Sequence, residues 1–231
     1  MSYRGRVETA EPRTPVRTYS ARRGRLSPLN QQRMSVLAPR HAIPDGPLLP
    51  REAFGRDAPV VLEIGCGHGA AAIAYAALQP GHDVLAVDVF TPALARMLAA
   101  AEQAGLTNLW VHQGDAVALL AERLAPSSLA AVHLFFPDPW PKARHAKRRF
   151  VAGPTLDLVA SRLQPGGCIL VATDHEGYAA HARAELAAHG RFVVTEGERP
   201  PWRPIDGFEA KGLAAGRAVT EFRATLAHRL K

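Results

Sequence analysis

The chain has 231 residues, of which 47% are hydrophobic, and a formal net charge of +7 at neutral pH. This length can bury a full core, so we expect one α/β domain with extensions. No apolar segment approaches the roughly 18 residues of a membrane span and no signal-peptide core is present, so we expect a cytoplasmic protein that makes no contact with membranes.

Cysteine and histidine usage argues against a metal protein. Cys66 and Cys168 are far apart in the sequence and lie inside apolar runs, so both should be buried thiols in a reducing compartment. The ten histidines form no H-E-x-x-H motif, and the chain has no C-x-x-C motif. We therefore predict no metal site.

The positive charge is concentrated in two segments. Residues 1–50 hold nine arginines and three acidic residues, a net charge of +6, and residues 142–149 hold five cations and no acid. The rest of the chain therefore has a net charge of −4. Such segmental basicity favours contact with a phosphate backbone.

The first 50 residues predict a basic extension and linker. Residues 1–30 are rich in arginine, contain proline and have almost no large apolar side chains, so they should stay mobile until they meet an anionic partner. A short amphipathic helix is predicted over 30–37 and a proline-rich linker over 39–50. The domain then occupies residues 51–231, and its packed part should start near Arg56.

The stretch over 59–77 predicts a ligand-binding turn. An apolar strand over 60–64 runs into three glycines, and an alanine-rich helix follows. Glycines allow a sharp turn close to a ligand, and the start of the helix offers free N–H groups to an anion. Gly65, Gly67 and Ala70 also satisfy the loose dinucleotide pattern G-x-G-x-x-A, so the turn alone does not distinguish between cofactors.

The next two predicted strands each lead to a carboxylate. The strand over 84–87 ends in Asp88, at a distance from the glycines that suits the ribose hydroxyls of either NAD or S-adenosylmethionine. Thr91 is expected to be the N-cap of the following helix. After the strand over 109–112, Asp115 is placed either to cap a helix or to hold an adenine amine.

The stretch over 132–149 combines an acid, an aromatic ring and a cationic run. A buried strand over 132–136 stops at Pro137, which places Asp138 at the carboxyl edge of the sheet, where open parallel sheets bind ligands. Trp140 and five cations follow. Taken singly, the acid could cap a helix, the ring could belong to the core and the cations could be a solvated face. Together, in this order, they indicate that a nucleobase of a polyanion is brought to the carboxylate.

The last third of the chain continues the alternation of helix and strand. A helix is predicted over 154–163 and a strand over 168–172, after which Asp174 lies at a strand end beside the first carboxylate. A further helix and strands over 191–195 and 218–226 complete the pattern. Repeated strand and helix units predict a doubly wound, mostly parallel sheet.

Three classes of protein share parts of this pattern. A nicotinamide-dependent dehydrogenase would use the same glycine turn and Asp88, but it gives no reason for a cationic run beside Asp138. A non-catalytic RNA-binding module would explain the arginines without needing four carboxylates at strand ends. An amino-group methylase usually shows D-P-P-Y, whereas Trp140 stands here in place of the second proline.

The motifs together carry a resemblance to a known family. They are E-I-G-C-G-H-G (63–69), V-D-V (87–89), G-D-A (114–116), F-P-D-P-W-P-K-A-R-H-A-K-R-R (136–149), A-T-D (172–174) and R-P-I-D-G-F-E (203–209). Over nearly its whole length after the basic tail, the chain resembles the tRNA (guanine-N7)-methyltransferase family. The glycine motif is shared by most S-adenosylmethionine-dependent methyltransferases, whereas the run over 136–149 is highly specific.

The resemblance implies a class I methyltransferase fold, a Rossmann-like sheet with a C-terminal antiparallel strand. It implies methyl transfer from S-adenosylmethionine to guanine N7 in the variable loop of tRNA, and we expect a monomer or homodimer. The implied cofactor-binding residues are Glu63, Gly65, Gly67, Asp88, Asp115 and Asp138, of which Asp138 is also the catalytic residue. The implied substrate-binding residues are Lys142, Asp174, Asp206, Phe208 and Glu209, and the implied RNA contacts are Arg144, His145, Lys147, Arg148 and Arg149. Asp206 stands where the family has a hydroxyl residue, while Phe208 and Glu209 match the family pattern.

Overall fold

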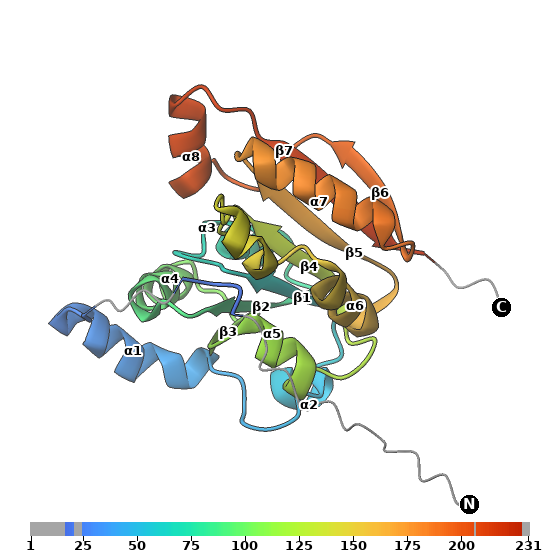
Figure 1. Ribbon diagram of the computed structural model, residues 1–231. Coiled ribbons are helices and arrows are strands. Elements are labelled where there is room, and N and C mark those ends of the chain that lie inside the picture. Colours follow the sequence, from blue (N-terminus) through green and yellow to red (C-terminus); the bar gives the residue numbers. More distant parts are fainter. Residues whose placement is uncertain (1–16, 21–24, 206, 228–231) are drawn as a thin grey trace, which may run out of the picture.

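The computed structural model describes residues 17–20, 25–205 and 207–227, and its centre is one sheet (Figure 1). The strands follow the order β3-β2-β1-β4-β5-β7-β6. They are β1 (Val60–Ile64), β2 (Asp83–Asp88), β3 (Leu109–Gln113), β4 (Leu129–Phe135), β5 (Leu163–Thr173), β6 (Phe192–Gly197) and β7 (Thr220–Leu226). The first five run parallel, and β7 is antiparallel to β5 and β6. The predicted doubly wound sheet with an antiparallel C-terminal strand is confirmed.

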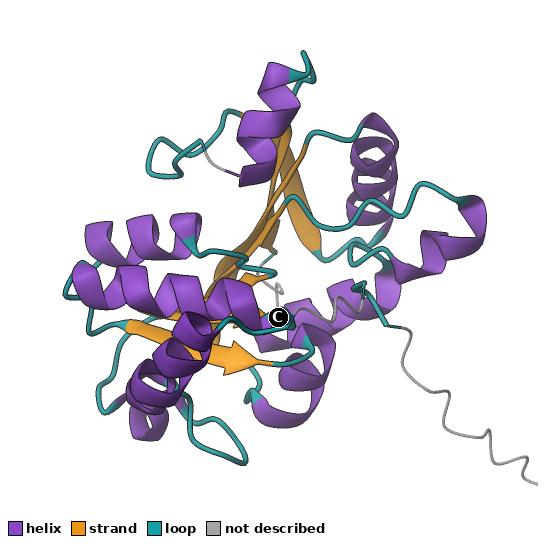
Figure 2. Cartoon of the chain, turned by 90° about the vertical axis from the view of Figure 1, so that its left-hand side faces the viewer, coloured by secondary structure: helices purple, strands orange, loops and turns teal. Residues whose placement is uncertain are grey.

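Helices lie on both sides of the sheet (Figure 2). They are α1 (Pro28–His41), α2 (Pro50–Phe54), α3 (Ala70–Leu78), α4 (Thr91–Gln103), α5 (Ala116–Ala118), α6 (Gly153–Arg162), α7 (Glu176–Ala188) and α8 (Gly207–Ala214), together with the π-helical turn η1 (Leu119–Arg123) and the 3₁₀ helix η2 (Ala143–Arg148). Helices α1, α3 and α4 pack in one core cluster, and α5, α6 and α7 pack in the other. Within the described ranges, no helix is both long enough and apolar enough to cross a membrane.

Alternation along the strands divides the core between these two layers. In β2, Val84 and Ala86 pack with α3 and α4, whereas Leu85 and Val87 belong to the opposite cluster. Successive side chains of a strand point to opposite faces, so one apolar strand supplies both layers. All five residues of β1 are buried, as expected for a central strand of a parallel sheet.

The strand order reverses between β1 and β4. From β1 the chain moves outward to β2 and β3, then crosses to β4 and moves outward again to β5. At such a reversal the loops after the two neighbouring strands diverge and leave a crevice at the carboxyl edge of the sheet. The glycine turn after β1 and the loop that contains Asp138 after β4 both border this crevice.

The packed part of the chain begins earlier than Arg56. Helix α1 is longer than predicted at both ends. Ile43 and Leu48 are buried in the core, and a backbone bridge joins Leu48 to Leu124. The predicted linker over 39–50 is therefore wrong, because these two apolar side chains fill the core although prolines surround them.

Two other predicted boundaries also change. Thr91 is the first residue of α4 rather than its N-cap, which is Phe90. Strand β5 begins at Leu163, ahead of the predicted strand over 168–172, because Leu163 pairs with Leu129 before a shift in register. Pro165, Gly166 and Gly167 thus lie within an irregular strand.

Candidate active site

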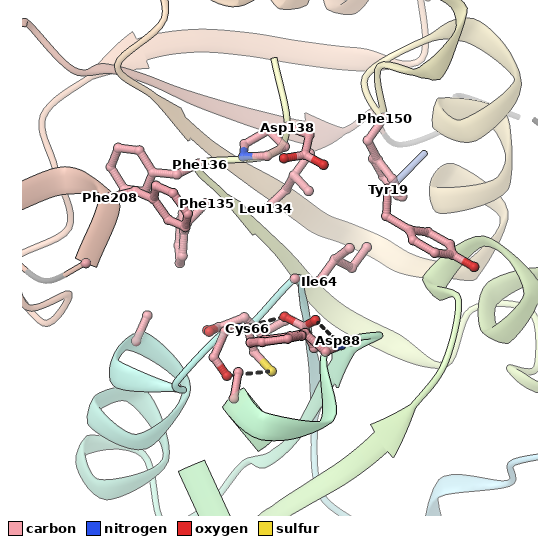
Figure 3. Close-up of a pocket in the computed structure, with 18 of the residues that line it drawn as sticks. Tyr19, Ile64, Cys66, Asp88, Leu134, Phe135, Phe136, Asp138, Phe150 and Phe208 are labelled. Atoms are coloured by element: carbon pink, nitrogen blue, oxygen red, sulfur yellow. Dashed lines mark hydrogen bonds between the residues drawn. The ribbon is translucent and has the colours of Figure 1, made fainter. Parts of the chain in front are cut away.

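A pocket of about 870 Å³ opens at the carboxyl edge of the sheet, beside the reversal between β1 and β4 (Figure 3). Many of the site residues predicted from the sequence line it. These are Glu63, Gly65, Gly67, Asp88, Asp115, Asp138, Asp174, Phe208 and Glu209. The predicted RNA contacts and Lys142 do not line the pocket, and Asp206 lies outside the described residues. The fold thus gathers acidic side chains from the ends of all five parallel strands.

The glycine turn wraps around the carboxylate of Asp88. Gly67 and Gly69 have φ angles of 55° and 77°, a region that residues with a Cβ disfavour. This conformation lets the N–H of Gly67 donate to Oδ2 of Asp88 at 2.8 Å, while Oδ1 accepts from the N–H of Phe90 at 2.8 Å. Asp88 therefore fixes the turn, and each of its oxygens keeps a lone pair for a ligand.

Glu63 presents a buried carboxylate at the floor of the pocket. It is 3% exposed and neighbours His133 across the ladder between β1 and β4. Oε2 of Glu63 lies 3.7 Å from Nδ1 of His133, and neither atom has a hydrogen-bond partner among the described residues. Oε2 is thus enclosed beside His133, and Glu63 can meet a ligand in the pocket through its other oxygen, Oε1.

Asp115 caps the helix that follows β3. Its Oδ1 accepts from the N–H of Val117 at 2.9 Å, which satisfies one of the free donors at the start of α5. This confirms the capping role that the sequence left open. Asp115 also lines the pocket, so its other carboxylate oxygen can serve a ligand.

Asp138 reaches the pocket from a strained loop. Phe136 and Trp140, on either side of it, have φ angles of 51° and 44° although neither is glycine. Backbone strain of this kind costs of order 1–3 kcal/mol per residue and is concentrated at functional sites. Oδ2 of Asp138 accepts from the N–H of Ser20 at 3.1 Å, and Figure 3 shows the carboxylate with Tyr19 and Phe136 at the pocket wall. The acid is therefore placed at the mouth of the sheet, and not in its interior.

Residues 17–20 lie against the same pocket. Three of them, Thr18, Tyr19 and Ser20, form part of its wall. The structure places this part of the predicted extension against the loop after β4, to which its backbone is hydrogen-bonded. The other predicted extension residues, 1–16 and 21–24, lie outside the described residues.

The cations after Trp140 divide into two groups. Arg148 stacks 3.7 Å from the centre of the Trp140 ring and donates to two carbonyls of the segment 17–20. Arg149 donates to the carbonyls of residues 139 and 140. The exposed cations are Lys142, Arg144 and Lys147. The run therefore includes side chains that hold the loop as well as side chains that face solvent.

Two titratable side chains at the site are held neutral. Burial raises the pKa of the Cys66 thiol well above its ordinary value, and the carboxylates of Asp88 and Glu63 raise it further. Desolvation, and then the neighbouring cations, lower the pKa of His145. At neutral pH the pocket holds a thiol in place of a thiolate, and the cationic run gains no charge from its histidine.

The C-terminal part contributes a buried ion cluster that sequence reasoning missed. Arg203 is 2% exposed and donates to Glu221 at 3.0 Å and to Glu209 at 3.2 Å. Its guanidinium also lies 4.6 Å from the centre of the Phe135 ring. The one sequence feature that pointed to Arg203 is its position at the start of the R-P-I-D-G-F-E motif. The cluster fixes Glu209 at the pocket wall.

Asp174 and Phe208 lie at the outer part of the wall. Asp174 accepts from Arg217 at 2.8 Å, so the loop before β7 is tied to the end of β5. Phe208, at the start of α8, is 58% exposed although it lines the pocket. An exposed aromatic ring at a pocket mouth is suited to stack on a flat ligand.

Comparison with solved structures defines the class of fold. The 16S rRNA methyltransferase KamB aligns with a TM-score of 0.56 and 18% sequence identity, covering 75% of this chain and 90% of that chain. A 16S rRNA (adenine(1408)-N(1))-methyltransferase from Catenulisporales acidiphilia, solved with its cosubstrate SAM, aligns with a TM-score of 0.54 and 16% identity, covering 80% and 94%. The chain therefore has the class I methyltransferase fold, as predicted.

Comparison of sequences defines the family. Residues 57–222 match a family model described as "Putative methyltransferase". The tRNA (guanine-N(7)-)-methyltransferase of Mycobacterium avium is 42% identical, over 94% of this chain and 90% of its own length. That of Nitrosospira multiformis is 43% identical, over 90% of this chain and 93% of its own length. The chain belongs to the tRNA (guanine-N7)-methyltransferase family, which confirms the resemblance seen in the motifs.

Proposed function

We propose that this protein transfers a methyl group from S-adenosylmethionine to N7 of a guanine in the variable loop of tRNA, forming 7-methylguanosine. The observation that carries the proposal is a pocket lined by acids from five strand ends in a chain of this family. We place the activity in the cytoplasm, as expected for an enzyme that acts on tRNA.

The charge of the pocket suits a cationic cofactor. Glu63, Asp88, Asp115 and Asp138 all line its wall, so the two phosphates of a dinucleotide would meet like charges there. When bound, S-adenosylmethionine supplies an electrophilic methyl group on a sulfonium. We assign Asp88 to the ribose hydroxyls, Asp115 to the adenine amine and Oε1 of Glu63 to the ammonium group. The four carboxylates in the wall, which would repel the phosphates of NAD, favour a methyl donor.

Methylation of guanine N7 requires alignment and no deprotonation. N7 already carries an in-plane lone pair, so a general base is unnecessary. Holding the two reactants in line can contribute about 7–11 kcal/mol, and a pocket poor in water favours loss of the sulfonium charge. We assign Asp138 to accept hydrogen bonds from N1–H and the exocyclic amine of the guanine, which would turn N7 toward the donor.

An Asp138→Ala variant tests the assignment of the catalytic residue. It should lose methyl transfer to unmodified tRNA while tRNA binding survives, as measured with a radiolabelled donor and a binding titration. Asp157→Ala is the matched control, because Asp157 is an exposed acid of α6 outside the pocket wall. Full activity of the Asp138 variant would refute its assignment. Nuclease digestion and mass spectrometry of the tRNA, showing a product other than 7-methylguanosine, would refute the reaction.

The exposed cations provide a separate test of the RNA surface. We propose that Lys142, Arg144 and Lys147 contact phosphates, and that the basic residues 1–50, with a net charge of +6, add to the same attraction. Arg144→Ala and Lys147→Ala should each raise KM for tRNA and reduce the salt slope of binding by about one. If binding is indifferent to both changes, these residues are only surface charge.

A further inference from the structure

Residues 17–20 form a short segment, here called the N-terminal strap, that Arg148 holds against the pocket. The Nε of Arg148 donates to the carbonyl of Arg17 at 3.0 Å, and its Nη2 donates to the carbonyl of Tyr19 at 2.7 Å. The same guanidinium stacks on the Trp140 ring at 3.7 Å. The planar fork of Arg148 is thus oriented by an aromatic ring beneath it and by two backbone carbonyls at its edge.

The N-terminal strap in turn contacts the acid assigned to the reaction. The N–H of Ser20 donates to Oδ2 of Asp138 at 3.1 Å, and the indole Nε1 of Trp140 donates to the carbonyl of Thr18 at 3.2 Å. Every bond from the strap to the loop uses a backbone atom of the strap. A chain of direct contacts therefore runs from Arg148 through the strap to the carboxylate of Asp138.

Arg148 differs in this respect from the other cations of its run. Arg144 and Lys147, on the same 3₁₀ helix, are exposed, whereas Arg148 is half-buried and two of its donors bond to strap carbonyls. The two bonds and the stack on Trp140 fix the direction of the guanidinium, so only the donors that the strap leaves free could reach a phosphate. The contacts of Arg148 are those of a side chain that holds the strap against the loop after β4.

We propose that Arg148 is a positioning residue, which acts through the N-terminal strap to hold the carboxylate of Asp138 in one orientation. The flanking prolines fix the backbone of Asp138, but they leave its side chain free to rotate. The N–H of Ser20 removes that freedom by fixing Oδ2, and each oxygen still has a lone pair for the two purine donors. The proposal rests on the function proposed above, because it assigns Asp138 to methyl transfer.

A proline at position 20 tests the hydrogen bond directly. Ser20→Pro removes the backbone N–H, and Ser20→Ala is the matched control because it removes the hydroxyl and keeps the N–H. A hydrogen bond to a carboxylate is strong enough that kcat of Ser20→Pro should lie about tenfold below kcat of Ser20→Ala, with KM for tRNA similar in the two variants. Equal kcat values for the two variants would overturn the proposal.

Arg148→Ala tests the anchor, and Arg144→Ala is its control. Arg148→Ala should lower kcat by about tenfold and leave the salt slope of tRNA binding as it is, whereas Arg144→Ala should raise KM and reduce the slope by about one. Combining Arg148→Ala with Ser20→Pro should lower kcat little further, since both changes break one chain of contacts. A slope reduced by about one with kcat unchanged would make Arg148 a phosphate contact and overturn the proposal.

The outcomes separate this proposal from the function on which it rests. If Asp138→Ala keeps full activity, the assignment of Asp138 fails, and the positioning role of Arg148 fails with it. If Asp138→Ala is inactive while Ser20→Pro matches Ser20→Ala, the function stands and only the positioning role is wrong.

Discussion

Replacing Arg203 by methionine should destabilise the protein more than the loss of an exposed ion pair does. Methionine keeps much of the length of the side chain but leaves the carboxylate of Glu221, 9% exposed, without the cation it pairs with. Glu209, 3% exposed, then keeps only its longer contact with Arg199, at 3.5 Å. Breaking a buried ion pair from one side costs about 3–5 kcal/mol. For a chain of this length that corresponds to a fall in Tm of about 6–20 °C.

Thermal and denaturant unfolding of Arg203→Met measure this loss, with Arg183→Met as the matched control. Arg183 pairs with Glu196 at 2.8 Å, but both side chains are about half exposed, so its loss should cost about 0–1 kcal/mol. Equal losses of unfolding free energy in the two variants would refute the argument from burial.

The deficit of Arg203→Met should also depend on pH. Burial raises the pKa of Glu221, and Arg203 opposes that rise, so the pKa should rise further in the variant. The folded variant then binds more protons than the unfolded chain above the ordinary pKa of a glutamate, and its stability falls as pH increases. A deficit that shrinks as pH is raised would contradict this reasoning.

Three further changes probe the fold. Leu48→Ala should cost about 2–5 kcal/mol in denaturant unfolding because Leu48 is fully buried, whereas Leu49→Ala, at a side chain 46% exposed, should cost much less; similar losses would mean that Leu48 is not part of the core. Gly69→Ala should cost about 2 kcal/mol or more, since φ is 77° and the added Cβ would lie 2.1 Å from a buried side-chain carbon, while Gly81→Ala meets no atom within 4 Å and should fold normally. Burial lowers the pKa of His112 from its ordinary value of 6.5, so below that pH the folded chain binds fewer protons than the unfolded chain. Lowering the pH through this range should therefore reduce Tm more in the native chain than in His112→Gln. The same reduction in both proteins would rule out His112 as the cause.

Much of the sheet could be predicted because its strands are dense in apolar residues and are bounded by residues that break strands. The strand over 60–64 was predicted with the bounds that β1 has, since glycines end it. The carboxylates at the strand ends followed from the same signal, because a parallel sheet brings all of these ends to one edge, whereas the sequence left Asp115 open between a helix cap and a ligand contact.

The remainder depends on contacts that leave little trace in local sequence. Leu48 is a buried leucine among prolines, and a single apolar residue does not predict a core position. The strap over 17–20 is held through backbone atoms, which every residue type offers equally. The sequence showed Arg203 only as part of a motif, because its role depends on ion pairs with residues 6 and 18 positions away along the chain.

The wall of the pocket draws on segments that are made at very different times during synthesis. Thr18 and Arg217 both contribute to it, and Arg148 follows Tyr19 by 129 positions. At ribosomal rates of about 5–20 residues per second, Tyr19 is made about 6–26 s before the side chain that anchors it. A nascent chain should therefore lack methyl-transfer activity until the segment that contains Arg217 has been translated and the pocket wall can close.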